Sequence, residues 1–360
     1  MKKYFFLLAA FVVFGSCAQQ KKKDDVALKT EPQTYKVEEV VKGLTIPWGM
    51  TWLPDGSMLI TEKDGRLIHF KNGKKNEIAN VPKVYNSGQG GLMDIELNPN
   101  YNENGWIYIT YASTEGPGNG GHTALMRCKL EGSSLTNIET LYKAEPNTTA
   151  GQHFGSRIEF DNDGFVYFSI GERGEREVNP QDITRDGGKI YRLNDDGSIP
   201  TDNPFYNEPN AKKAIFTYGN RNPQGMAKHP ETGEIWMHEH GPKGGDEINI
   251  VKKGANYGWV AVTYGINYSG TKITDETTKP GIEPPIYYWV PSIAPQWKGK
   301  LLVGSLKFAY VELLTLEGEK VTNREKIAQD IGRVRNVKMG PDGLIYIAVE
   351  GQGIFRLVPE

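Results

Sequence analysis

The sequence feature best suited to chemistry is a histidine that precedes a strand-and-turn unit ending in a carboxylate. His153 lies in the segment Gly151-Gln-His-Phe-Gly-Ser-Arg157, and Glu172 closes the unit that follows. A neutral imidazole is a competent base near pH 7, and a neighbouring carboxylate would fix its tautomer. Later loops add four cations, and the whole set suits an enzyme that holds a polyanionic cofactor beside a hydroxyl-bearing substrate. These cations are Arg221, Lys307, Arg333 and Arg335.

The elements that must position these loops are short strands. The 360 residues include 42 glycines, 18 tyrosines and 7 tryptophans, and long amphipathic helical patterns are hardly found. One phrase recurs: a small apolar lead-in, a turn of Pro, Asp, Asn and Gly, and then alternating apolar residues. Asp-Gly between strands favours a hairpin because glycine accepts positive φ. Copies lie at 52–60, 97–109, 160–168, 229–237, 297–303 and 339–347.

Six copies at intervals of roughly 45 to 70 residues predict an all-β, six-bladed β-propeller of four-stranded antiparallel blades. The first and last copies lie near the two ends of the domain, so the terminal strands are expected to close the ring within one blade. The irregular spacing predicts insertions in the loops, where such a fold keeps its active site. A β-sandwich of repeated hairpins is the alternative, although one sandwich would not need six similar units.

The N-terminal segment predicts export. A basic Met1-Lys-Lys3 precedes an apolar run over 4–14 that is too short to span a bilayer, and Gly15-Ser-Cys17 follows. This pattern predicts a lipoprotein signal peptide over 1–17 with Cys17 as the lipid-modified first residue of the mature protein. A flexible polar tether over 18–34 and a propeller domain over 35–360 would follow, at the periplasmic or cell-surface side of a membrane. An ordinary secretory peptide with an incidental cysteine is the alternative.

Charge and cysteine content exclude several classes of partner and bond. The net charge is −2 and the pI is near 6.4, which favours neither nucleic acid nor an anionic membrane surface as a partner. Once Cys17 is lipidated, Cys128 has no disulfide partner. Cys128 stands in a strand-like alternation and is expected to be a small core residue.

Several motifs in a fixed order resemble the glucose/sorbosone dehydrogenase family, the soluble aldose sugar dehydrogenases that depend on pyrroloquinoline quinone (PQQ). The resemblance covers essentially all of the chain from about Tyr35. It implies a six-bladed propeller, PQQ with a bridging calcium ion, and oxidation of the C1 hydroxyl of aldoses to lactones, with electrons passed to an external acceptor. The motifs include Gly171-Glu-Arg-Gly174, Gly219-Asn-Arg-Asn-Pro-Gln-Gly225, Glu239-His-Gly-Pro242, Asn256-Tyr-Gly-Trp259 and Gly304-Ser-Leu-Lys307.

The resemblance also implies roles for single residues. His153 matches the base, and Glu172 stands where relatives carry an aspartate that orients it. Arg221 and Asn222 match the pair beside the quinone oxygens. The other cofactor contacts implied are His240, which replaces a glutamine of a glucose-oxidising relative, Ser292, and the carboxylate-binding cations Lys307, Arg333 and Arg335.

The calcium ligands implied by the resemblance are the backbone carbonyls of Gly241 and Pro242, and calcium prefers such oxygen donors. His238 and His240 could instead form a transition-metal pair, but the sequence supplies no evident further ligand for one. Sugar-pocket positions match Gln89, Gln152 and Tyr287. Val290 replaces a stacking tryptophan of the family.

The long insertions that narrow the pocket of the glucose-specific relative are absent, which leads to the hypothesis of broad aldose specificity. Two other functions remain open. A calcium-dependent lactonase-type hydrolase would need acidic metal ligands at the channel centre and would leave the arginines without a role. A non-catalytic, lipid-anchored binding propeller would not take up the cofactor.

Overall fold

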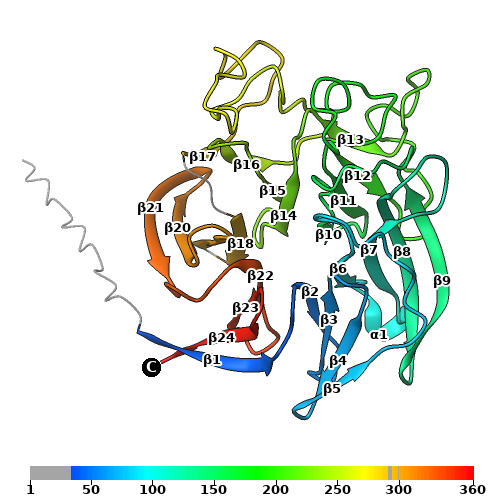
Figure 1. The fold of residues 1–360 in the computed structure, drawn as a ribbon, viewed down its shortest axis with the longest axis vertical. Coiled ribbons are helices and arrows are strands. Elements are labelled where there is room, and N and C mark those ends of the chain that lie inside the picture. Colours follow the sequence, from blue (N-terminus) through cyan, green and yellow to red (C-terminus); the bar gives the residue numbers. More distant parts are fainter. Residues whose placement is uncertain (1–33, 291–293, 299) are drawn as a thin grey trace, which may run out of the picture.

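The computed structural model describes residues 34–290, 294–298 and 300–360, and they form six four-stranded antiparallel sheets arranged in a ring (Figure 1). This confirms the predicted six-bladed β-propeller. Blade one contains β2 (Pro47–Trp52), β3 (Met58–Glu62), β4 (Leu67–Lys71) and β5 (Lys74–Glu77). Blade two contains β6 (Leu92–Leu97), β7 (Ile107–Ser113), β8 (His122–Glu131) and β9 (Ser134–Lys143), with a one-turn helix α1 (Tyr101–Asn104) between its first two strands.

The next three blades continue in chain order. Blade three contains β10 (Ile158–Phe160), β11 (Val166–Ile170), β12 (Lys189–Leu193) and β13 (Ile215–Tyr218). Blade four contains β14 (Pro223–Lys228), β15 (Ile235–Glu239), β16 (Asp246–Ile250) and β17 (Tyr287–Trp289). Blade five contains β18 (Ala294–Lys298), β19 (Lys300–Gly304), β20 (Val311–Glu317) and β21 (Lys320–Ile327).

Blade six joins the two ends of the chain, as the position of the first and last repeats predicts. It contains β22 (Val334–Met339), β23 (Ile345–Val349) and β24 (Gly353–Pro359), and its outer strand is β1 (Tyr35–Lys42). The register runs from Tyr35 opposite Pro359 to Lys42 opposite Gly353. Blue β1 therefore lies beside red β24 in Figure 1 and closes the ring.

Each repeated phrase of the sequence covers the turn between the first and second strands of one blade. Because neighbouring strands are antiparallel, these six turns lie on one face of the ring. The connections from second to third strands, and from one blade to the next, lie on the opposite face. His153, Glu172, Arg221 and Gly241 all stand in connections of this second type, so the fold gathers them on one face.

The hydrophobic core is divided into clusters between consecutive blades. Leu59 and Leu67 of blade one pack with Leu92 and Ile109 of blade two, and equivalent clusters occupy the other five junctions. Cys128 is fully buried in the first of these junctions, and burial raises the pKa of its thiol to about 12. It is therefore the small core residue that the strand pattern predicts.

The predicted signal peptide with Cys17, and the tether as far as residue 33, lie outside the described residues. Within the part of the chain that the structure describes, no helix is both long and apolar enough to cross a membrane.

A buried ion pair ties three blades together at their innermost strands. Arg157, directly before β10, donates from Nη1 to Asp94 Oδ1 of β6 at 2.7 Å and from Nε to the Gln224 carbonyl of β14 at 3.0 Å. Asp94 Oδ2 accepts the backbone N–H of Ile158 at 2.9 Å. The side chains of Arg157 and Asp94 are 8% and 4% exposed, so each charge depends on the other for compensation.

Asp94→Ala should lower the free energy of unfolding by about 3–5 kcal/mol, because it leaves the Arg157 guanidinium buried without its counter-ion. Chemical denaturation measures the loss. Lys71→Ala is the matched control, since the Lys71–Asp55 pair is about half exposed and its removal should cost about 1 kcal/mol or less. Equal losses in the two variants would show that the central pair has no special structural weight.

Candidate active site

The predicted base and its carboxylate meet in the structure. His153 Nδ1 is hydrogen-bonded to Glu172 Oε1, so the longer glutamate reaches the imidazole where relatives use aspartate. The Glu172 side chain is 2% exposed and that of His153 is 13% exposed. A neutral His153 that donates from Nδ1 to this carboxylate has its lone pair on Nε2, where it can accept a proton.

The backbone of His153 is held in an uncommon conformation. Its φ is 57°, in the left-handed region, and such a non-glycine residue persists only where its surroundings fix it. One fixing contact comes from Gln89, whose Oε1 accepts the His153 N–H at 2.9 Å. Gln89, which the resemblance places in the sugar pocket, therefore has a positioning contact in this structure.

Arg173 supplies a second fixing contact, and the sequence reasoning assigned it no role. Its guanidinium donates to the carbonyls of Ala150 at 2.6 Å and Gly121 at 3.2 Å, and also to that of Gln152. It lies 3.4 Å from the centroid of the Phe154 ring. Burial lowers its pKa to about 10, which still leaves it charged at neutral pH. Arg173 thus ties the segment before His153 to the turn that carries Glu172.

Arg221 and Asn222 connect the histidine loops to the loop before β16. Arg221 Nη1 donates to the carbonyls of His240 and Gly241, each at 2.8 Å. The Arg221 carbonyl accepts the N–H of Glu172 at 2.8 Å, and Asn222 Oδ1 accepts the N–H of Gly155 at 3.0 Å. The predicted pair therefore lies directly against the base and its carboxylate, where a cation can stabilise negative charge.

Beneath Arg221 lies a buried acidic residue that the sequence reasoning left without a role. Glu239 accepts the Arg221 N–H at 2.5 Å and the side-chain amide of Asn220 at 3.0 Å. Burial raises the pKa of Glu239 to about 7, although these hydrogen bonds oppose the shift. Burial and the charge of Glu239 raise the pKa of neighbouring Glu247 well above its usual range. The motif Glu239-His-Gly-Pro242 is the sequence feature that could have indicated this role of Glu239 in holding the Arg221 backbone.

The donor set around Gly241 fits an oxygen-preferring cation. Gly241 is tightly enclosed, since a Cβ there would lie 2.3 Å from the Gly244 carbonyl oxygen. Asp246 is buried and its Oδ1 accepts the Gly241 N–H at 2.6 Å. The Gly241 carbonyl, which also accepts from Arg221, and the Pro242 carbonyl are hard oxygen donors of the kind that calcium prefers.

Asp246 also lies near His238 and His240, the possible transition-metal pair for which the sequence indicated no third metal ligand. Its Oδ2 is 3.4 Å from His240 Nδ1 and 3.8 Å from His238 Nε2, and one ligand atom from each residue falls within 4.8 Å of the others. Burial alone would raise the pKa of Asp246, but hydrogen bonding to the two histidines lowers it below its usual range.

The predicted carboxylate-binding cations gather at the junction of blades five and six. Arg333 and Arg335 both contact Glu350, at 3.2 and 2.8 Å from their Nε atoms, so they project to one side as their alternation predicts. Arg333 also donates to the Leu306 carbonyl at 3.2 Å, which brings the exposed Lys307 segment beside them.

A fourth cation, Lys63, was missed by the sequence reasoning. Burial, and next the charge of Arg335, lower its pKa. Lys63, Arg333 and Arg335 lie near the carboxylate Glu350, and Lys307 stands in the adjoining segment. This concentration of positive charge fits a cofactor with several carboxylates.

The remaining predicted sugar and cofactor residues are more dispersed. Gln152 is exposed beside His153, whereas Tyr287 lies between blades four and five and accepts a 3.0 Å hydrogen bond from Arg324. Val290 is 65% exposed next to this second location. Ser292 lies outside the described residues.

A family model, a sequence relative and solved structures all relate this chain to sugar dehydrogenases. The model of the family described as Glucose / Sorbosone dehydrogenase matches residues 44–356. Aldose sugar dehydrogenase YliI of Escherichia coli (strain K12) is 40% identical over 344 residues, covering 90% of this chain and 92% of that protein. The apo-form structure of the soluble Escherichia coli aldose sugar dehydrogenase has a TM-score of 0.86 at 38% identity, covering 91% of this chain and all of the other.

A second solved structure is the PQQ-bound form of an aldose sugar dehydrogenase from Streptomyces coelicolor. It has a TM-score of 0.75 at 28% identity and covers 91% of this chain and 99% of that one. The fold described above is therefore shared with an aldose sugar dehydrogenase whose structure contains this cofactor.

The His153 imidazole should titrate below 6.5, its ordinary pKa, because burial lowers the pKa more than the Glu172 hydrogen bond raises it. The base form would then predominate at pH 7. Glu172→Gln removes the opposing contribution, so the pKa of His153 should fall further. Histidine ring resonances followed by NMR measure both values, with Glu175→Gln, an exposed carboxylate on the same loop, as the control. A His153 pKa that rises in Glu172→Gln would contradict this account of the site.

Proposed function

The chain belongs to the glucose/sorbosone dehydrogenase family and is an oxidoreductase acting on sugar CH–OH groups, and on that premise we propose that it oxidises the C1 hydroxyl of aldoses to lactones with PQQ and Ca²⁺. The observation that carries the proposal is the His153–Glu172 pair placed directly against Arg221. It joins a base, the group that orients it and a cation on one face of the propeller.

The residues of this chain divide the work as follows. His153 takes the proton of the C1 hydroxyl at Nε2 while Glu172 stabilises the imidazolium that forms. PQQ, when bound, supplies the two-electron oxidant that receives the hydride from C1. Arg221 would stabilise the negative charge that develops in the reaction. Lys307, Arg333 and Arg335 would hold the cofactor carboxylates, and the carbonyls of Gly241 and Pro242 would hold the calcium ion.

The proposal extends to the sugar and to the location of the enzyme. Without the long insertions of the glucose-specific relative, the open face should admit several aldoses. The signal pattern that ends at Cys17 supports export as a lipid-anchored protein, with an external electron acceptor. A lactonase-type hydrolase or a non-catalytic binding propeller would leave Lys63, Arg333 and Arg335, the cations near Glu350, without a ligand.

Reconstitution tests the proposed reaction. Protein starting at Lys29 is mixed with PQQ and CaCl₂, and dye reduction is followed with glucose, xylose, galactose and maltose. We expect turnover of several sugars that requires both PQQ and calcium, and loss of turnover after treatment with a strong chelator at elevated temperature. Activity confined to glucose would refute broad specificity. Absence of both dye reduction and bound-PQQ absorbance would refute the dehydrogenase function and favour one of the alternatives.

His153→Ala should reduce kcat by roughly a hundredfold or more, because it removes the base. PQQ uptake, measured by visible absorbance, should change little, since the carboxylate-binding cations remain. His69→Ala, a histidine on β4 that pairs with Ser57, is the control and should keep full activity. A fully active His153→Ala variant would eliminate this residue as the base.

A further inference from the structure

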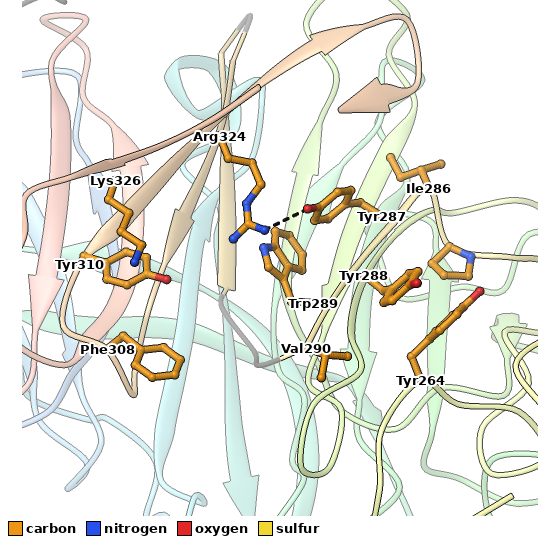
Figure 2. A pocket seen from close by; sticks show the side chains of 11 residues that line it. Tyr264, Ile286, Tyr287, Tyr288, Trp289, Val290, Phe308, Tyr310, Arg324 and Lys326 are labelled. Carbon is orange, nitrogen blue, oxygen red and sulfur yellow. Dashed lines mark hydrogen bonds between the residues drawn. The ribbon is translucent and has the colours of Figure 1, made fainter. Parts of the chain in front are cut away.

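A cavity of about 710 Å³ lies between blades four and five (Figure 2). Most of its lining is aromatic, and Figure 2 shows two groups of rings on either side of it. Tyr264, Tyr288 and Trp289 stand on the blade-four side, and Phe308 and Tyr310 come from the connection between β19 and β20.

The blade-four side of the cavity presents a flat aromatic platform. The rings of Tyr264 and Tyr288 stack with centroids 3.7 Å apart and an interplanar angle of 9°. Tyr288 is 45% exposed and Val290 is 65% exposed, and Phe308 on the blade-five side of the cavity is 37% exposed. Large apolar side chains that gather in one exposed place, instead of being scattered, mark a binding surface.

Two cationic side chains stand on the blade-five side of the cavity, across from this platform. Arg324 is held by the buried Glu312 at 2.7 Å and by the Tyr287 hydroxyl at 3.0 Å, so its charge is compensated. Lys326 Nζ lies 4.8 Å from the centroid of the Tyr310 ring. Apolar faces with a few placed hydrogen-bonding groups are the usual lining of a small-molecule site. They match a neutral pyranose ring, whose faces expose C–H groups and whose edges carry hydroxyls.

The cavity borders both loops that carry the proposed cofactor contacts. On one side, the Trp289 carbonyl accepts the Gly245 N–H at 2.7 Å. Gly245 belongs to the same loop as Gly241, whose carbonyl accepts a hydrogen bond from Arg221. On the other side, Phe308 directly follows Lys307 in the connection that contacts Arg333. A molecule in the cavity would therefore contact residues that are hydrogen-bonded to, or continuous with, these two loops.

We propose that this cavity is a subsite for the further units of an oligosaccharide whose reducing-end sugar is oxidised at His153. The inference rests on the proposed function and adds its substrate class: neutral oligosaccharides in preference to monosaccharides. The Tyr264–Tyr288 platform would stack against a pyranose face, and Arg324 and Lys326 would donate to its hydroxyls.

Binding is measured first without any turnover. Calorimetric titration of the PQQ-free protein with maltotetraose, cellotetraose and glucose should show tighter binding of at least one tetrasaccharide than of glucose. Tyr288→Ala should weaken tetrasaccharide binding by about fivefold or more, the loss expected for one aromatic contact. Tyr268→Ala is the matched control, because Tyr268 is 75% exposed and lies outside the cavity lining. No tetrasaccharide preference, or equal losses in the two variants, would overturn the subsite.

Steady-state kinetics of the reconstituted enzyme give a second readout. Tyr288→Ala and Lys326→Ala should lower kcat/KM for the preferred tetrasaccharide by about fivefold and leave that for glucose within twofold. If these variants instead change only the KM of the electron-accepting dye, the cavity binds the acceptor and the proposal is wrong. Tetrasaccharide binding that depends on Tyr288, in a protein inactive with PQQ, would support the subsite while refuting the dehydrogenase function.

Discussion

The buried Arg157–Asp94 ion pair is the constraint on which the rest of the site depends. A ring of blades packed only through apolar junctions fixes how far apart the blades lie, but such packing is non-directional. The ion pair and the Arg157 hydrogen bond to Gln224 add direction, because they set the register of the first strands of blades two, three and four. His153 lies four residues before Arg157 and Arg221 three residues before Gln224. Their relative placement therefore follows from a contact at the axis of the ring.

The repeated turns made the fold predictable, because a hairpin turn needs glycine or asparagine at defined positions and so leaves a local trace in the sequence. Ring closure was predictable for the same reason, from where the first and last turns stand. The support around the base left no such trace. Arg173 acts on backbone carbonyls from three different positions, and Glu239 acts on a backbone N–H. Contacts of this kind depend on loop conformation, which no spacing or periodicity of residue types records.

On the face of the ring that carries the candidate active site, the two sides differ in charge. On the side of blades five, six and one, Lys63, Arg333 and Arg335 lie near the carboxylate Glu350, with Lys307 in the adjoining segment. Burial lowers the pKa values of both Lys63 and Arg335. On the blade-four side, Glu239, Asp246 and Glu247 crowd together below Arg221. The proposed polyanionic cofactor and divalent cation would each offset one of these concentrations of like charge.

Closure of the ring by β1 also sets the order in which the protein can be completed. Tyr35 pairs with Pro359, so the first strand of the domain finds its partner only after the last one has been made. At roughly 5–20 residues per second, synthesis of the intervening chain takes on the order of half a minute. Through that interval β1 lacks its partner strand, and the apolar junction between blades six and one is incomplete. The ring can therefore close only after the last strand has been made, and truncation at either end of the domain would remove strands of the same blade.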